Sequence, residues 1–91
     1  MYLEIVSPEA TLFSGEVDSI AVPGVNGEFE MLNNHAPIVA LLQKGTVKIS
    51  GSITLEEAVK TKFTKSDNGF WLTIKSGTLE MKDNKIIVLA D

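Results

Sequence analysis

The sequence contains no cysteine and no arginine, and these two absences exclude several kinds of site. Without cysteine the chain can form no disulfide, no thiolate metal site and no cysteine nucleophile. Without arginine it lacks the side chain that reads guanine bidentately and the side chain that acts as an arginine finger. The formal net charge is −4 and all 8 basic residues are lysines. Composition therefore argues against a nucleic-acid-binding protein.

Long apolar runs and nucleotide-binding glycine motifs are also missing. No uninterrupted apolar run approaches the roughly 18–20 residues that a membrane-spanning helix needs. The first ten residues, "MYLEIVSPEA", do not have the basic and then apolar regions of a signal peptide. The segment "PGVNG" lacks the spacing and the following lysine of a phosphate-binding loop. We therefore expect neither a membrane span nor a nucleotide site here.

The chain has 91 residues, of which 44% are hydrophobic and 22% charged. These values predict one small domain over residues 1–91, burying roughly 60–65% of its unfolded surface. Apolar and polar residues alternate in most segments, and Gly, Pro and Asn turn signals separate them. The predicted strands are 2–6, 17–24, 28–32, 46–50, 70–75, 78–81 and 85–90, and 11–17 is a short apolar pair ended by Ser14-Gly15. Leu3 and Ile5 fall on one face of 2–6, with one face buried, and Val47 and Ile49 point inward from 46–50. This pattern predicts an all-β fold, a flattened β-sandwich or barrel of about eight to ten short strands.

Two segments depart from simple alternation. Residues 38–42, "IVALL", are apolar at both parities, which indicates either a strand buried between two sheets or an outer side covered by a partner. Within 51–69 we favour strand, because Thr, Val, Ile and Phe dominate its flanks. The alternative is a helical turn with Thr54 as N-cap and Glu57 at the capping-box position.

The chemical candidates gather in "GEFEMLNNHAP", residues 27–37. Glu28, Glu30 and His35 could form a metal-dependent hydrolase site only if the loop folded back on itself. The favoured interpretation is a turn histidine bonded to the backbone and two carboxylates on a solvated strand face. A second hypothesis is a free-standing β-sandwich module that binds a sugar or peptide, with Trp71 and the 28–35 loop as its site.

Residues 3–49 strongly resemble the N-terminal β-domain of the ATP synthase epsilon subunit. The landmarks are "VSPE", "LFSGEV", "PG", "GEF", "HAP" and "KGTVKI", in this order and spacing. The segment "SGTLEMKDNKIIVLAD", residues 76–91, is similar to the closing strand pair of that family, whereas 51–69 resembles it poorly. Members usually have Pro-Gly where this chain has Asn33-Asn34, and a small residue where it has Glu30. Many members also continue past the position of Asp91 into a two-helix domain.

The resemblance implies a non-catalytic rotor subunit without a cofactor, peripheral to the cytoplasmic face of the inner (plasma) membrane. Its implied partners are the gamma subunit and the polar loops of the c-ring, with Glu28 as the carboxylate that meets the ring. The ring-contact residues implied are Glu28, Phe29, Glu30, Met31 and Leu32. The gamma-contact residues implied are Ser7, His35, Ala36, Pro37, Ile38, Ala40 and Leu42. Which parity of 38–42 faces gamma stays open.

Overall fold

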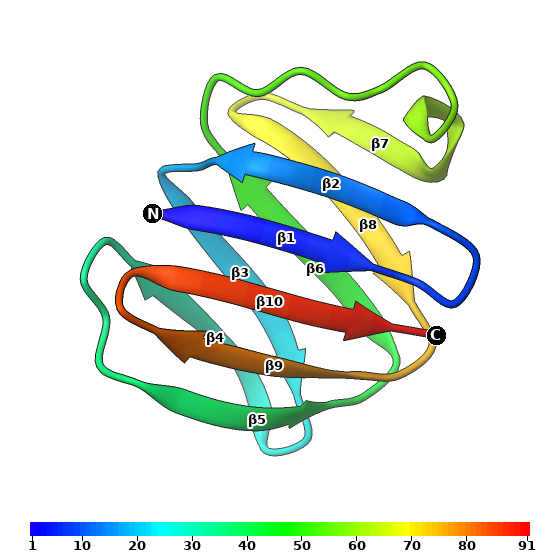
Figure 1. Ribbon diagram of the computed structural model, residues 1–91. Helices are drawn as coiled ribbons and strands as arrows, with labels where there is room; N and C mark the ends of the chain where they lie inside the picture. Colours follow the sequence, from blue (N-terminus) through cyan, green and yellow to red (C-terminus); the bar gives the residue numbers. More distant parts are fainter.

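The computed structural model describes residues 1–91 as ten β-strands and one 3₁₀ turn (Figure 1). The elements are β1 (Tyr2–Val6), β2 (Thr11–Glu16), β3 (Ser19–Gly24), β4 (Gly27–Leu32), β5 (Ile38–Leu42), β6 (Gly45–Ser50), η1 (Lys60–Lys62), β7 (Phe63–Ser66), β8 (Gly69–Ile74), β9 (Gly77–Lys82) and β10 (Lys85–Ala90). The expected all-β class is confirmed, and the number of strands agrees with the expected eight to ten.

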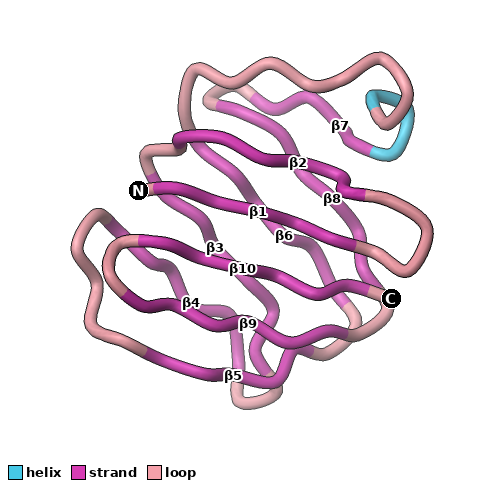
Figure 2. Tube along the Cα trace, in the orientation of Figure 1, coloured by secondary structure: helices cyan, strands magenta, loops and turns pink.

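One hydrogen-bonded sheet folds over itself into two layers. Its strand order is β2-β1-β10-β9-β5-β3-β6-β8-β7, and β4 pairs with β3 outside this path. We call β2, β1, β10, β9 and β5 the front layer, and β4, β3, β6, β8 and β7 the rear layer. In Figure 1 the front strands cross over the rear strands at an angle, and Figure 2 shows the loops at the ends of both layers. A single pair, Gly24 with Leu42, joins β3 to β5.

The core lies between the layers and is built by strand alternation. Leu3 and Ile5 of β1 point inward, as do Val47 and Ile49 of β6, and all four side chains are buried. Successive residues of a strand point to opposite faces, so these pairs place one face of each strand in the core. A cluster of 22 buried hydrophobic residues results. The inward parity predicted for β1 and β6 is confirmed.

The segment 51–69 differs from the predicted strand. Only β7, from Phe63 to Ser66, is extended, and the turn η1 precedes it. Leu55, Val59 and Phe63 are buried, but Glu57 and Thr61, which would share their face in a strand, are exposed, so the pattern suits turns. The backbone amide of Lys62 donates to the Val59 carbonyl at 2.9 Å, closing one such turn. The alternative, a helical turn in this segment, agrees with η1, but Thr54 is not its N-cap because the turns begin only at Glu56.

Candidate functional site

Strand β4 carries the five residues implied to contact a ring, and it is held on one edge only. Its ladder pairs with β3, from Ser19 opposite Leu32 to Gly24 opposite Gly27. Alternation sends Met31 into the core, where its side chain is fully buried, and leaves Phe29 partly buried against the core. Glu28, Glu30 and Leu32 lie exposed on the opposite face. Only these three side chains are therefore free to meet a partner, while Met31 and Phe29 hold the strand in place.

Glu28 already has an intramolecular partner on that face. Its Oε1 lies 3.1 Å from Nζ of Lys48, which belongs to β6. The same ammonium lies 5.1 Å from the centre of the Trp71 ring in β8, within the range of a cation–π contact. Lys48 was not predicted as a site residue, because nothing in the sequence gives its register against Trp71. The sequence pattern only marks Lys48 as outward.

A metal-dependent hydrolase site is not formed by these residues. No group of three His, Cys, Asp or Glu side chains is placed so that it could hold a metal ion. Nδ1 of His35 lies 2.7 Å from the carbonyl oxygen of the adjacent Ala36, as expected for a turn histidine. The hypothesis that Glu28, Glu30 and His35 converge is therefore wrong, because the imidazole faces its own backbone.

A sugar or peptide site at Trp71 is not favoured either. The ring lies in a surface depression that also includes Glu28, Glu30 and Lys48. A sugar ring stacks on an open aromatic face, whereas Lys48 already lies over this ring. The Trp71 depression is thus built as a charged contact network, and it lacks the apolar lining typical of ligand pockets.

The outer surface of the front layer carries a row of apolar side chains. Val6 of β1 lies opposite Leu89 of β10. Thr78 of β9 lies between Leu89 and Leu41 of β5. Leu41 is 63% exposed and Leu89 is also exposed. The β3–β4 turn extends the row, because the amide of Val25 donates to the Leu41 carbonyl at 3.2 Å.

A second row runs beside the first with mixed character. Glu4 of β1 lies opposite Ile87 of β10, and Glu80 of β9 lies between Ile87 and Val39 of β5. Val39 is 75% exposed. We name the apolar members of both rows the outer apolar face: Val6, Val25, Val39, Leu41, Ile87 and Leu89. These apolar side chains lie on both sides of Thr78 and Glu80 of β9. Apolar side chains gathered on one outer face are typical of a protein interaction surface.

This geometry resolves the parity of β5. Val39 and Leu41 point outward, whereas Ile38 and Ala40 are partly buried and Leu42 is 3% exposed. The strand is therefore not enclosed between two sheets. Leu42, implied as a gamma contact, is buried in the core, whereas Val39 and Leu41, which were not implied, lie exposed on the outer surface. The sequence could not supply this distinction, because both parities of 38–42 are apolar.

The other implied gamma-contact residues lie at two different ends of this layer. Ser7 begins the β1–β2 turn, where its amide donates to the Ala10 carbonyl at 2.8 Å, and it lines the depression beside Leu41. Residues 35–37 cross from β4 of the rear layer to β5 of the front layer. Ser7 is thus continuous with the outer apolar face, while 35–37 connects that face with β4.

The whole chain, residues 1–91, matches the family described as the ATP synthase Delta/Epsilon chain, beta-sandwich domain. It belongs to this family. Among curated relatives, the ATP synthase epsilon chain of Chlorobaculum tepidum is 36% identical over 89 residues, covering 98% of this chain and 86% of the relative. The epsilon chain of Leptospira borgpetersenii is also 36% identical, and there the alignment covers 98% of this chain and 59% of the relative. The epsilon-type resemblance of the landmarks is thus confirmed, and it extends through 51–69.

A solved structure agrees with the fold of this epsilon-type domain. The central stalk and c-ring structure of the Tetrahymena thermophila mitochondrial ATP synthase contains a chain that superposes with a TM-score of 0.73. The two share 14% identity, and the match covers 99% of this chain and 62% of the other. At that identity the likeness establishes the two-layer β fold. No helix of this chain is long and apolar enough to span a membrane.

Proposed function

We propose that this epsilon-type chain is a non-catalytic rotor subunit of an F-type ATP synthase, linking the gamma subunit to the c-ring. Its outer apolar face would bind gamma, and the exposed residues of β4 would contact the polar loops of the ring. Proton-driven rotation would pass through this joint. The chain would then lie peripherally at the cytoplasmic face of the plasma membrane, held there by the complex.

The single observation that carries the proposal is the exposure of Val39 and Leu41 beside Leu89. Val39 and Leu41 lie two positions apart on the outer side of β5, and Leu89 lies in the same row as Leu41 with Thr78 between them. In an epsilon-type domain, a partner that covered this face would remove all three aliphatic side chains from water. Burying such side chains is worth roughly 25 cal/mol per Å² of apolar area, so even a small cluster contributes to binding. A joint that carries torque should bury on the order of 1,600 Å² in total.

Glu28 and Glu30 of β4 would set the orientation of the chain on the ring more than its affinity for the ring. Glu28 and Glu30 lie side by side on the exposed face of β4, and a basic or polar ring loop would meet them. Complementary charge across an interface steers approach and fixes register, while its net contribution to affinity is small. The outer apolar face would thus supply affinity for gamma, and β4 would supply alignment on the ring.

Affinity purification of the tagged chain from its own cells tests the gamma contact. We expect the gamma subunit to co-purify with the unaltered chain and to be lost with Val39→Lys. The new ammonium can pair with the neighbouring Glu80, so folding is preserved. Thr73→Lys is the matched control, because Thr73 is exposed on the outside of the rear layer. Failure of the unaltered chain to retain gamma, or equal loss with both variants, would overturn the proposal.

A further inference from the structure

We infer that Asn84 is a positioning residue that fixes the turn after β4 to the β9–β10 turn. This inference rests on the proposed function, because it concerns how the ring-facing strand is aligned with the gamma-facing layer. Asn84 lies in the front layer between β9 and β10, and the turn that it holds directly follows Leu32 of the rear layer. The side chain therefore joins the two surfaces to which the proposal assigns different partners.

The residues of the turn after β4 do not by themselves favour the conformation that the turn adopts. The amide of His35 donates to the Leu32 carbonyl at 3.1 Å, which closes a four-residue turn over Asn33 and Asn34. Asn34 has a φ of 62° and Asn33 does not have positive φ, so the turn is of type II. Proline at the second position and glycine at the third suit such a turn best. This chain has neither there, and Asn34 must instead be held in the left-handed region that asparagine only tolerates.

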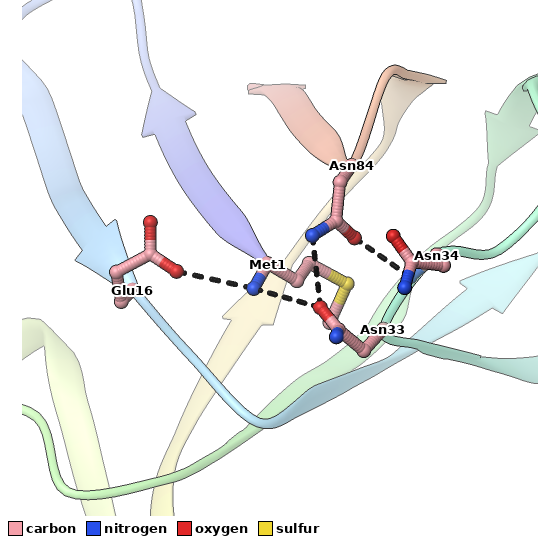
Figure 3. A network of polar contacts seen from close by, with 5 residues as sticks. All are labelled: Met1, Glu16, Asn33, Asn34 and Asn84. Carbon is pink, nitrogen blue, oxygen red and sulfur yellow. Dashed lines mark hydrogen bonds and ion pairs between the residues drawn. The ribbon is translucent and has the colours of Figure 1, made fainter.

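Both ends of the Asn84 amide bind this turn, as Figure 3 shows. Its Oδ1 accepts a hydrogen bond from the backbone amide of Asn34 at 2.7 Å. Its Nδ2 donates to Oδ1 of Asn33 at 2.9 Å. Because a backbone amide can only donate, the first bond fixes which end of Asn84 is oxygen and leaves Nδ2 for Asn33. One side chain thus engages the two central residues of the turn.

Asn84 is itself held firmly. It has a φ of 61° and follows Asp83, whose φ is 52°, in a two-residue turn of type I′ that matches strand twist. Its backbone carbonyl accepts a hydrogen bond from the amide of Tyr2 at 3.1 Å. The backbone of Asn84 is therefore fixed to β1, independently of the contacts that its side chain makes with the turn after β4. A rigid support of this kind can order the flexible turn, whereas two mobile loops could not order each other.

A second contact to Oδ1 of Asn33 completes the network in Figure 3. The amino group of Met1 donates to Oδ1 of Asn33 at 3.1 Å and to Oε1 of Glu16 at 3.1 Å. The oxygen of Asn33 therefore accepts from two front-layer donors. The turn after β4 is held to Met1 and to the β9–β10 turn, and Met1 is in turn paired with Glu16 at the end of β2.

The network acts where the sheet provides little support. Strand β4 pairs with β3 alone, so its second edge forms no ladder, and the chain must leave it to cross between layers. Asn33 and Asn34 are exposed and Asn84 is partly buried, so their bonds compete with water. The net contribution of such hydrogen bonds to the global free energy of unfolding is small, but they order the local backbone. The expected consequence is a fixed orientation of Leu32 and of the crossover 35–37.

Amide hydrogen exchange of the folded chain is the direct test. Asn84→Gly keeps the positive φ of the turn, which glycine adopts without strain, and removes both side-chain bonds. We expect exchange of the Asn34 amide to rise by about tenfold, with smaller increases at His35. Asp83→Gly is the matched control, since it alters the neighbouring positive-φ residue and Asp83 makes no side-chain hydrogen bond to the turn. Equal exchange at Asn34 in the two variants would overturn the inference.

Coupling is the functional readout. In membranes reconstituted with each variant, we expect Asn84→Gly to lower the protons pumped per ATP hydrolysed, while gamma still co-purifies. Asn33→Ala removes the hydrogen bonds that Asn33 accepts from Asn84 and from Met1, without altering the β9–β10 turn, and it must lower coupling as well. If the unaltered chain restores no coupling, the proposed function fails. If it restores coupling and Asn84→Gly matches Asp83→Gly, only the positioning role is refuted.

Discussion

Glu28 and Lys48 form an ion pair across the outer face of the rear layer, with 3.1 Å between Oε1 and Nζ. Both side chains are partly exposed, so the pair contributes only about 0–1 kcal/mol to folding. A ring loop that binds Glu28 must therefore compete with Lys48 or use the carboxylate oxygen that the pair leaves open. The pair keeps the Glu28 carboxylate oriented, and because the pair is weak, Glu28 can leave Lys48 for a ring loop at little cost in free energy.

Glu28→Lys is expected to leave the fold intact and to weaken coupling. The substitution places a second ammonium beside Lys48, and it reverses the charge offered to a basic ring loop. The free energy of unfolding should change by about 1 kcal/mol or less, as measured by urea denaturation. Proton pumping driven by ATP should fall. Glu56→Lys is the control for the charge change itself, because Glu56 is exposed in the turns before β7, lies outside both proposed contact surfaces and has no ion-pair partner. Unchanged pumping with Glu28→Lys would remove Glu28 from the contact set.

Met31 and Leu32 are adjacent in β4 and should respond in opposite ways to truncation. Met31 is fully buried, so Met31→Ala leaves a cavity and should cost about 2–5 kcal/mol of unfolding free energy. Leu32 is 57% exposed, so Leu32→Ala should cost well under half of that. Thermal unfolding of the two variants distinguishes them. Similar midpoints would mean that β4 is not anchored through Met31.

Much of the fold could be predicted from alternation alone, because a strand with one buried face has apolar residues at every second position. Leu3, Ile5, Val47 and Ile49 were assigned inward on this basis and are buried. The method could not resolve 38–42, where both parities are apolar. Only the structure, in which Leu41 is exposed and Leu42 is buried, shows which side faces outward. The strand prediction was wrong for residues 51–62 for a related reason. These residues form turns, in which buried side chains do not recur at every second position.

The polar part of the site was harder to predict, because its contacts are long-range. Asn33 and Asn84 are 51 positions apart, and nothing local to either marks the other as its partner. Asparagine beside a turn also has an ordinary explanation in its tolerance of positive φ. The sequence therefore predicted a turn histidine at His35 but not the contacts that hold the turn at Asn33-Asn34. Lys48 follows the same rule, since its contacts to Glu28 and Trp71 depend on sheet register.

Gly69 is expected to be the least tolerant glycine of the rear layer. A Cβ at this position would lie 1.9 Å from the carbonyl oxygen of Ile49, in the ladder between β6 and β8. Backbone cannot move aside as a side chain can, so Gly69→Ala should separate the two strands locally. The cost should be at least about 1–3 kcal/mol by chemical denaturation.

Gly15→Ala is the control for that prediction. Its Cβ would lie 3.3 Å from the ring of Phe13, a side chain that can shift by a few tenths of an ångström. We expect a smaller loss of stability at Gly15 than at Gly69. The reverse order would show that the β6–β8 ladder is looser than the contacts indicate.

Leu41 and Leu42 separate binding from folding by the same chemical change at neighbouring positions. Leu41→Asp puts a carboxylate into water on the outer apolar face, so the free energy of unfolding should change by about 1 kcal/mol or less. Leu42→Asp buries an unpaired charge in the core, which should prevent cooperative folding. With purified gamma subunit, calorimetry should therefore show a folded Leu41→Asp chain with weakened binding. A Leu41→Asp chain that binds as tightly as the unaltered one would place the gamma contact elsewhere, because a desolvated carboxylate at the centre of an apolar interface cannot be neutral to affinity.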